Sequence, residues 1–577
     1  MKCMMRELKV YAKEIILIIL TVIGTTMCTL GLPLLLTRLI DHAIPDENFA
    51  GVFAIVGIML LLVVVGVLCG IATSHLSASV SMGVGRNLRS KLFHKVQSFS
   101  QAEIDAFSTS SLITRTNNDV TQIQRFLNQC LRIAIQAPVM CICGIILAIR
   151  STPSLASILV LAVPLMTVVL VAIGKLAVPL SSKIQQKIDE LNLVMREKLT
   201  GVRVIRAFGT TEFEAERFGK INQDYKKINK KMQRTTNSVL PVLTVIISLT
   251  VGGVMLMAAN QYLNKGADFT IGEVMAIIQY ILQIMMAVTM LTMVFIMLPR
   301  ATTAANRAQE ILTRESVIRD PEKAVSGDGR KGYLTFRNVS FTYEGASVPA
   351  IRNLSFEAKP GEVTAIIGGT GMGKSTIVNL IPRLYDATEG QVLVDGVDVR
   401  DYKLEDLRAK IGFVPQKALL FKVTIESNIA FGDENADEYR IEEAVRIAQS
   451  YDFIMKKEEG FDSPISQGGT NVSGGQRQRL CIARAVVRKP EIYVFDDSFS
   501  ALDFKTDKAL RAALAKETQD ATTVIVAQRI STIIDADRII VVENGDIVGM
   551  GKHHELIKNC EIYKEIVRSQ MGEEEVK

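Results

Sequence analysis

Long apolar stretches alternate with charged segments over the first half of the chain. Six of these stretches reach or approach the roughly 20 residues that a helix needs to cross the hydrocarbon core of a bilayer. They lie near Ile15–Thr37, Val52–Ala72, Ile133–Ile149, Leu155–Ala177, Val239–Ala259 and Ile271–Leu298. Hydrophobic residues make up 48% of the 577 residues, and the mean hydropathy is +0.25. The pattern predicts an all-α, six-helix membrane domain embedded in a lipid bilayer.

The connections between the apolar stretches alternate between short and long. The two long connections follow the second and fourth stretches, and their apolar residues recur with helical spacing, which predicts long helical extensions that turn near residues 101–110 and 208–213. Both are basic, through Arg86, Arg89, Lys91, Lys95, Arg115 and Arg125 in the first and Lys183, Lys187, Arg196, Lys198, Arg203 and Arg206 in the second. Lysine and arginine stay on the cytoplasmic side of membranes. We therefore expect a multi-pass protein of the cytoplasmic membrane with both termini in the cytoplasm.

The composition changes after Pro299, where the hydrophobicity falls. We expect a membrane domain over residues 1–305, a linker over 306–330 and a cytoplasmic domain over 331–577. In the last of these, the run VTAIIGGTGMGKST fits the phosphate-loop pattern GxxxxGK[ST], with a strand before it and a helix after it. The fold class predicted is six membrane helices with long cytoplasmic extensions, followed by an α/β P-loop NTPase domain.

The phosphate loop supplies the candidate residues for nucleotide binding. Its glycines allow backbone N–H groups to surround phosphate oxygens, and its lysine adds positive charge. The loop comprises Gly368, Gly369, Thr370, Gly371, Met372, Gly373, Lys374, Ser375 and Thr376. Ser375 and Asp496, which ends the apolar run EIYVFDD, are candidate Mg²⁺ ligands, and Asp497 occupies the position of a general base. ATP and Mg²⁺ are the cofactors expected, with ATP hydrolysis as the reaction.

Together with the run SGGQ, these residues resemble the ATP-binding cassette (ABC) family, specifically bacterial half-transporters with six membrane helices followed by one cassette. The resemblance covers essentially the whole chain. It implies an adenine-stacking role for Tyr343, a link between Mg²⁺ and the membrane domain at Gln416, and a D-loop ending at Asp503. It identifies Ser473, Gly474, Gly475 and Gln476 as the signature. In this family, each ATP lies between the phosphate loop of one cassette and the signature of another, and long cytoplasmic extensions are typical of exporters.

Two catalytic positions depart from the family pattern. Asp497 stands where the family has glutamate, and Gln528 stands where it has histidine. Aspartate withdraws its carboxylate by roughly 1 Å, and a displacement of that size costs on the order of 100-fold in rate. Glutamine cannot become cationic, so it stabilises developing charge less well. We expect Gln416, Asp497 and Gln528 to form a slow, degenerate catalytic site.

The resemblance and the two departures together predict one subunit of a heterodimeric, multidrug-type exporter, whose partner is a second ABC half-transporter. A homodimer with two slow sites, and a backbone shift that restores the reach of Asp497, remain alternatives. The expected substrate is a small amphipathic or hydrophobic molecule, and because no charged pocket stands out in the apolar stretches, the sequence does not distinguish a drug from a lipid or a peptide. The net charge of +6 gives no indication of a nucleic-acid partner. Two other functions stay open, an exporter-like importer of a metal chelate and a membrane-bound regulatory ATPase without transport.

Overall fold

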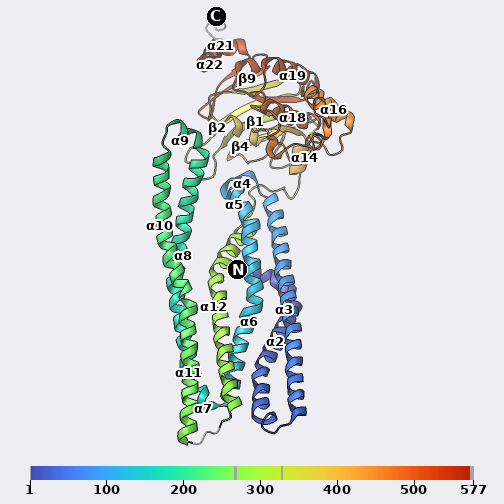
Figure 1. Ribbon diagram of the computed structural model, residues 1–577. Coiled ribbons are helices and arrows are strands. Elements are labelled where there is room, and N and C mark those ends of the chain that lie inside the picture. Colours follow the sequence, from blue (N-terminus) through green and yellow to red (C-terminus); the bar gives the residue numbers. More distant parts are fainter. Residues whose placement is uncertain (1, 266–268, 326–328, 572–577) are drawn as a thin grey trace. The chain divides into compact units, whose positions relative to one another are not determined.

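The structure is a computed structural model that describes residues 2–265, 269–325 and 329–571 (Figure 1). Residues 326–328 of the expected linker and the last six residues lie outside the described part. The chain separates into two compact units. The first contains the residues up to Gln97 and Thr109–Arg314, and the second contains Ser98–Ser108 and the residues from Glu315 onward.

In the described residues of the first unit, the regular elements are all helices. They are α1 (Lys2–Leu8), α2 (Ala12–Arg38), α3 (Phe49–Gln97), α5 (Thr109–Thr114), α6 (Val120–Ser151), α7 (Pro153–Ala156), α8 (Ile158–Thr200), α9 (Val202–Ala207), α10 (Thr211–Asn237), α11 (Val239–Lys265) and α12 (Ile271–Thr313). Within the described residues, six helical stretches are long and apolar enough to cross a membrane. The predicted six-helix membrane domain is confirmed.

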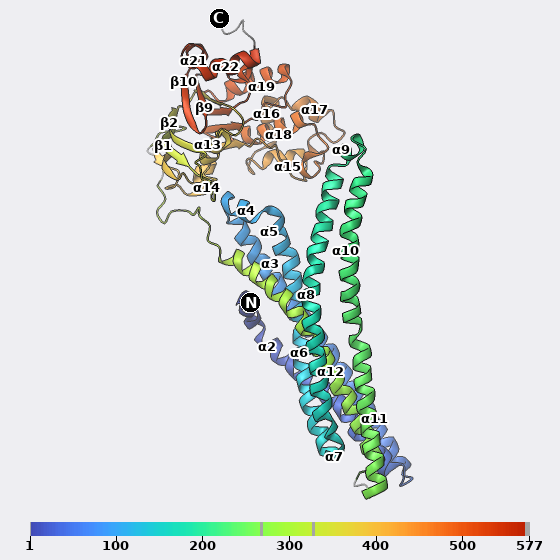
Figure 2. The same ribbon diagram turned by 90° about the vertical axis from the view of Figure 1, so that its left-hand side faces the viewer.

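Several of these helices are much longer than a bilayer requires. Helix α3 has 49 residues, and at 1.5 Å per residue it extends about 70 Å, more than twice the hydrocarbon thickness. Helices α8 and α10 lie side by side, with α9 at their junction (Figures 1 and 2). Helix α10 has no buried residue and is rich in charge, as a solvated extension should be.

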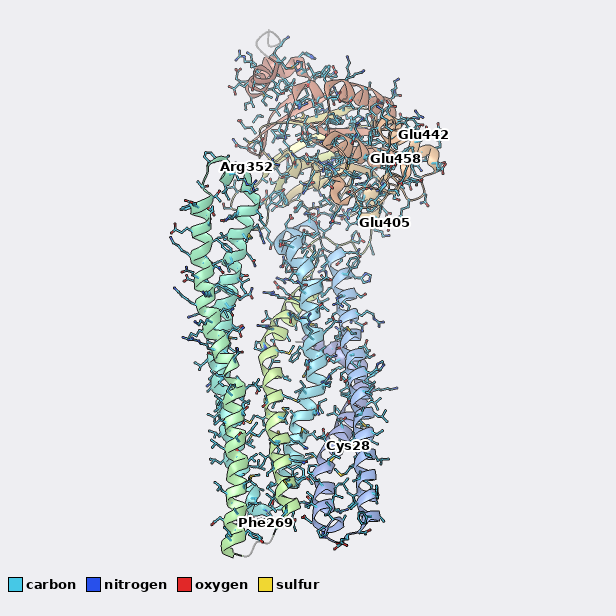
Figure 3. The ribbon with its side chains drawn as sticks, in the orientation of Figure 1. Cys28, Phe269, Arg352, Glu405, Glu442 and Glu458 are labelled. Atoms are coloured by element: carbon cyan, nitrogen blue, oxygen red, sulfur yellow. The ribbon has the colours of Figure 1, made fainter. Side chains whose placement is uncertain are left out.

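The core of the first unit is apolar, with a few polar groups that join distant helices. Tyr280 of α12 is fully buried, and its hydroxyl donates a hydrogen bond of 3.3 Å to the Leu30 carbonyl oxygen of α2. Asp41 accepts hydrogen bonds from the Gly272 amide, at 2.8 Å, and from the Thr270 hydroxyl, which ties the end of α2 to the start of α12. All eight cysteines are free thiols. Figure 3 labels one of them, Cys28 on α2, and also Phe269, which lies just before the start of α12.

The second unit contains two β-sheets. Its strands are β1 (Leu334–Phe341), β2 (Ile351–Ala358), β3 (Val363–Ile367), β4 (Glu389–Val394), β5 (Val397–Asp398), β6 (Ile411–Val414), β7 (Ile492–Asp496), β8 (Thr522–Val526), β9 (Arg538–Glu543) and β10 (Asp546–Gly551). The smaller sheet is antiparallel in the order β2-β1-β4-β5, and the larger follows the order β10-β9-β3-β8-β7-β6. In the larger sheet, β6, β7, β8, β3 and β9 are parallel. Strands β7 and β8 are buried along their whole length, as is usual for central parallel strands, and β7 has the continuous apolar run IYVF before Asp496.

Helices cover the sheets of the second unit. They are α4 (Gln101–Phe107), α13 (Lys374–Leu380), α14 (Leu404–Ala409), α15 (Ile425–Ala430), α16 (Glu438–Ile447), α17 (Tyr451–Met455), α18 (Gly474–Val486), α19 (Phe504–Glu517), α20 (Ile530–Ile533), α21 (His553–Asn559) and α22 (Glu561–Met571). One apolar core joins the larger sheet to α16, α18 and α19, and a second joins the two sheets to α13. The predicted α/β domain is confirmed, and the parallel strands β3 and β7 end at the same edge, where the candidate phosphate and metal groups follow.

Candidate nucleotide-binding site

The phosphate loop connects β3 to α13 with two glycines in the left-handed region, Gly371 at φ 82° and Gly373 at φ 92°. A Cβ added to Gly368 would lie 2.1 Å from the Val542 carbonyl oxygen, and one added to Gly373 would lie 2.5 Å from that of Ala350. Larger residues would therefore displace backbone on both sides of the loop. Glycine-rich loops of this kind can turn successive N–H groups inward, which suits an anion such as phosphate.

Lys374 begins α13 and folds its side chain back over the loop. Its ammonium donates hydrogen bonds to the carbonyl oxygens of Gly368, at 2.9 Å, and Gly369, at 2.6 Å. Burial lowers the pKa of this ammonium, and the neighbouring Asp497 and Asp496 oppose that effect. The positive charge is thus held among the loop glycines, where it would meet the outer phosphates of a nucleotide.

Ser375 and Asp496 meet at the carboxyl edge of the larger sheet. The Ser375 hydroxyl donates a hydrogen bond of 3.1 Å to the Asp496 carboxylate, which is only 4% exposed. Burial raises the pKa of Asp496, although the Ser375 hydrogen bond opposes this. A hydroxyl and a carboxylate are hard oxygen donors of the type that Mg²⁺ prefers, so the pair fits the expected metal. An ion bound here would offset the charge of the nucleotide phosphates.

Asp497 is held by the two glutamines that the sequence analysis placed in the catalytic site. The Gln528 side-chain amide donates a hydrogen bond of 3.0 Å to one carboxylate oxygen of Asp497, and the Gln416 amide donates to the same oxygen at 3.5 Å. The Asp497 backbone is left-handed, at φ 49°, and its N–H donates to the Val526 carbonyl oxygen of β8 at 3.0 Å. Burial raises the pKa of this carboxyl. The three candidate catalytic residues therefore form one hydrogen-bonded group.

Tyr343 follows β1 and lies close to the phosphate loop. Its hydroxyl is 3.0 Å from the Thr376 hydroxyl of α13, and its ring packs edge-on against Phe341 and Tyr385. Tyr343 is 37% exposed, which leaves part of the residue accessible to a base. Met372 is the loop residue that accepts a hydrogen bond from the Asn544 amide, while Thr370 is exposed.

The signature caps α18. The Ser473 hydroxyl accepts a hydrogen bond from the Gln476 amide at 3.3 Å, and the Gln476 side-chain oxygen accepts one from the Ser473 amide at 3.0 Å. Gly474 and Gly475 form the first helical turn, and a Cβ on Gly475 would lie 2.9 Å from the Ala501 carbonyl oxygen. The helix start thus presents free N–H groups and packs against the D-loop. Asp503 caps α19 by accepting from the Thr506 amide at 3.0 Å, and these bonds lower the Asp503 pKa.

Two residues without a sequence motif of their own, Gln478 and Gln570, join these motifs. Gln478 is buried in α18, and its side chain accepts from the Ala501 amide at 3.1 Å and donates to Ser500 at 3.4 Å. Gln570 of α22 donates to the Gln528 carbonyl oxygen at 2.7 Å and accepts from the Ile530 amide at 2.8 Å. Gln478 lies two residues beyond the signature and could have been found from helical spacing. Gln570 is 42 residues from Gln528, and no local sequence signal indicates it.

The turn of the first long connection belongs to the second unit. Helix α4 starts with a capping box, in which the fully buried Glu103 accepts from the Ser100 amide at 2.7 Å and the Ser100 hydroxyl at 2.6 Å. The same carboxylate accepts from the Val317 amide at 3.0 Å and from Ser316 at 3.4 Å. Burial opposes ionisation of Glu103, but its hydrogen bonds outweigh burial and lower its pKa. Glu103 therefore fixes α4 to the segment that follows α12.

Replacing Glu103 with glutamine should loosen this attachment, because the amide cannot accept the same set of hydrogen bonds and leaves donors unpaired. We expect the Ser100 and Val317 amides to exchange with deuterium about 10- to 100-fold faster, corresponding to the 1.5–3 kcal/mol typical of hydrogen bonds to a charged group. Hydrogen-exchange mass spectrometry of the full-length chain measures this. Glu315→Gln, which removes only an exposed ion pair with Arg319, is the matched control and should change little. Equal exchange in both variants would contradict the assigned role.

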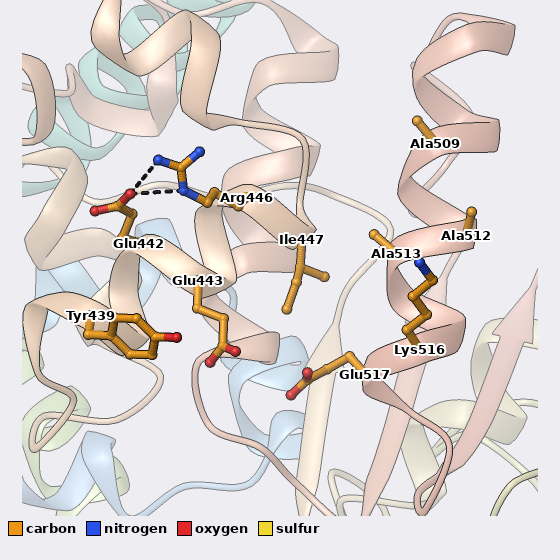
Figure 4. A pocket seen from close by; sticks show the side chains of 10 residues that line it. All are labelled: Tyr439, Glu442, Glu443, Arg446, Ile447, Ala509, Ala512, Ala513, Lys516 and Glu517. Carbon is orange, nitrogen blue, oxygen red and sulfur yellow. Dashed lines mark hydrogen bonds and ion pairs between the residues drawn. The ribbon is translucent and has the colours of Figure 1, made fainter.

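A separate hollow of about 670 Å³ lies between α16 and α19 (Figure 4). Charged side chains and small alanines line it, and Arg446 pairs with Glu442 at its edge. None of the candidate nucleotide or metal residues lines this hollow. The candidate site is instead defined by the edge of the larger sheet, the phosphate loop and the residues that contact them.

Each of the two units matches a family of known proteins. Residues 15–288 match the ABC transporter transmembrane region, and residues 351–500 match the ABC transporter family. The chain is 38% identical over 569 residues to an uncharacterized ABC transporter ATP-binding protein of Mycobacterium tuberculosis, covering 98% of this chain and 97% of the relative. It is 32% identical to the ATP-dependent lipid A-core flippase of Salmonella typhimurium over 535 residues, covering 92% and 91%.

A solved structure supports the same assignment. The structure of a bacterial Atm1-family ABC exporter with ATP bound is similar to this chain with a TM-score of 0.81 and 25% identity, covering 98% of this chain and 99% of the other. The membrane helices, the cassette and their order along the sequence therefore agree across complete chains. The protein belongs to the ABC transporter family, as an ATP-driven exporter half-transporter with its membrane domain and ATP-binding cassette in one polypeptide.

Proposed function

We propose that this chain is one subunit of a heterodimeric exporter and that its own ATP site binds nucleotide but hydrolyses it slowly. The observation that carries this proposal is the hydrogen bond of 3.0 Å between the Gln528 amide and the Asp497 carboxylate. In this arrangement, the short carboxylate at the position of the general base is engaged by a neutral amide. A histidine at position 528 could carry positive charge to the γ-phosphate, and glutamine cannot.

The proposed ATP site otherwise has its binding groups. The phosphate loop and Lys374 would hold the phosphates, Ser375, Gln416 and Asp496 would hold Mg²⁺, and Tyr343 would stack on adenine. Mg²⁺ would supply charge neutralisation at the β- and γ-phosphates. Because binding and hydrolysis depend on different residues, loss of the second does not require loss of the first. The chain would then keep ATP bound over many turnovers of its partner.

The signature of this chain would complete the ATP site of the partner subunit. Its two glycines, the Ser473 cap and the start of α18 offer N–H donors to a phosphate. Gln478 links this helix to the D-loop. The partner, a second half-transporter with glutamate and histidine at the two catalytic positions, would carry most of the hydrolysis. Alternate closing and opening of the paired cassettes would drive export of a small amphipathic or hydrophobic molecule from the cytoplasmic side.

The experiment that tests this proposal compares the chain alone with the complex isolated from its native membrane through a tag on this chain. Alone in nanodiscs, the chain should bind a fluorescent ATP analogue with micromolar affinity and hydrolyse ATP at least tenfold more slowly than the complex. In inside-out vesicles, the complex should move an amphipathic dye into the lumen when ATP is added, and right-side-out vesicles should not accumulate it. Full activity of the isolated chain would contradict the heterodimer, and ATP-driven uptake by right-side-out vesicles would contradict export.

A further inference from the structure

A cavity of about 620 Å³ lies among α2, α3 and α6 of the membrane unit. Its lining divides into an apolar part and a polar part that includes two basic side chains. The apolar part comprises Val22, Val67, Gly70 and Ile71, and the polar part comprises Thr25, Thr73, Ser74, His75, Arg132 and Gln136. The two basic residues, His75 and Arg132, lie just outside the expected apolar stretches and come from two helices that are far apart in sequence.

The antiparallel packing of α3 and α6 brings the basic residues to one level. The Asn128 side chain of α6 donates to the Ser81 hydroxyl of α3 at 3.4 Å, which fixes the register of the two helices. His75 lies six residues before Ser81 on α3. Six residues after Asn128 on α6 is position 134, so His75 lies level with the segment between Arg132 and Gln136. The two basic side chains therefore belong to one end of the cavity.

The basic end lies at the edge of the bilayer, on the side of the long connections. Arg132 directly precedes the apolar stretch 133–149 of α6, and His75 lies three residues beyond the apolar stretch 52–72 of α3. Both residues therefore lie where the membrane-spanning stretches end, at the depth of lipid headgroups. Val67 lies within the apolar stretch of α3, about 12 Å along the helix from His75, and so among acyl chains. The cavity thus changes from apolar to basic along the direction in which a lipid changes from tail to headgroup.

Among the described residues, no aspartate or glutamate lines this cavity. Neither α3 nor α6 carries an aspartate or glutamate, and Glu14 of α2 lies two turns away from Val22. In the part of the chain that the structure describes, Arg132 and His75 have no hydrogen-bond or ion-pair partner, and both are exposed. By contrast, two threonine hydroxyls in the cavity already donate hydrogen bonds within the protein. The Thr73 hydroxyl donates to the Thr21 hydroxyl, and the Thr25 hydroxyl donates to the Thr21 carbonyl oxygen. Only the basic end offers unused donors.

We propose that this cavity binds an amphiphile with a phosphate headgroup from the cytoplasmic leaflet, and that this amphiphile belongs to the substrate class of the transporter. Arg132 would bind two phosphate oxygens with its planar guanidinium, and Gln136 and Ser74 would add hydrogen bonds. Val22, Val67 and Ile71 would contact the first part of an acyl chain. The proposal rests on the proposed export function and on the cytoplasmic placement of the long connections. It narrows the amphipathic substrate class to an anionic one.

Binding is measured on the complex in detergent micelles, through the fluorescence anisotropy of a dye-labelled phosphatidic acid. Arg132→Gln with His75→Gln should weaken binding about tenfold or more, because charge-assisted hydrogen bonds to phosphate are lost. Arg132→Lys should weaken it less, since the charge remains. Arg150→Gln, which removes an exposed charge from the outer end of the same helix, is the matched control and should leave binding unchanged. Size-exclusion chromatography checks that each variant is folded.

Competition separates the possible ligands. Unlabelled phosphatidic acid should displace the probe, whereas inorganic phosphate and phosphatidylcholine at the same concentration should not. Displacement by inorganic phosphate would overturn the lipid and indicate a free-anion site, and equal displacement by phosphatidylcholine would overturn the role of charge. Equal affinity in Arg132→Gln and Arg150→Gln would show that Arg132 only anchors its helix at the interface. Because the readout is binding, its failure is distinct from a failure of transport.

Discussion

The double substitution Asp497→Glu with Gln528→His is expected to raise ATP turnover by the isolated chain about 100-fold. Glutamate extends the carboxylate by roughly 1 Å toward the position of an attacking water, and displacements of that size change rates by on the order of 100-fold. Histidine replaces an amide that now engages the carboxylate at 3.0 Å, and it can carry positive charge. Steady-state phosphate release at saturating ATP measures the change.

The backbone around Asp497 favours this expectation over the alternative of a shift that restores reach. The Asp497 N–H is bonded to β8 at 3.0 Å, and the Asp497 carbonyl oxygen accepts from the Ser500 hydroxyl at 3.0 Å. Moving the chain toward the nucleotide would break both bonds. The left-handed backbone at φ 49° suits aspartate better than glutamate, so Asp497→Glu should also lower stability by about 1 kcal/mol.

The single substitutions are the controls for this experiment. Asp497→Glu alone should produce part of the gain, and Gln528→His alone less, because the water would still lack a well-placed base. ATP affinity should stay within a few-fold of the wild type in all three variants, since the phosphate loop is unchanged. If the wild-type chain alone already hydrolyses ATP like the double variant, the degenerate site is wrong.

In the complex, Ser473→Ala is expected to reduce ATP turnover at least tenfold, and Lys374→Ala by only a few-fold. Ser473 would act on the ATP of the partner, where most hydrolysis is proposed to occur. Lys374 would act on the proposed slow site of this chain. Turnover of the complex at saturating ATP, together with photo-crosslinking of azido-ATP to each subunit, distinguishes the two effects. Lys374→Ala should remove the label from this chain and leave the label on its partner.

Ser473 also caps α18, so its replacement costs about 1 kcal/mol of helix stability apart from any contact with nucleotide. Asp437→Ala is the matched control, because Asp437 caps α16 through a bond of 2.9 Å from the Arg440 amide and lies outside the signature. If Asp437→Ala and Ser473→Ala reduce turnover equally, the loss is structural. If Lys374→Ala is the more damaging variant, the proposed asymmetry is reversed.

The sequence was sufficient to predict the elements whose patterns are local. Apolar runs long enough for a bilayer predicted the membrane helices, and a strand, a glycine loop and a helix in succession predicted the phosphate loop. Asp496 and Ser375 could be paired from sequence because parallel strands end at one edge of a sheet, and the structure places them 3.1 Å apart. The hydrogen bonds among Asp497, Gln528 and Gln416 give a geometry to residues that sequence reasoning had selected from three separate motifs.

Contacts between residues far apart in the chain required the tertiary structure. Glu103 and Val317 are more than 200 residues apart, and neither stands out from its neighbours in sequence. Gln570 bonds the segment after β8 from the last helix, and Arg132 and His75 share a cavity only because α3 and α6 pack antiparallel. The sequence by itself determined the membrane helices, the cassette and the chemical types at its motifs, since those follow from local periodicity and spacing. The structure alone decided which polar groups meet, because hydrogen bonds and cavities depend on distances that close only when the chain folds.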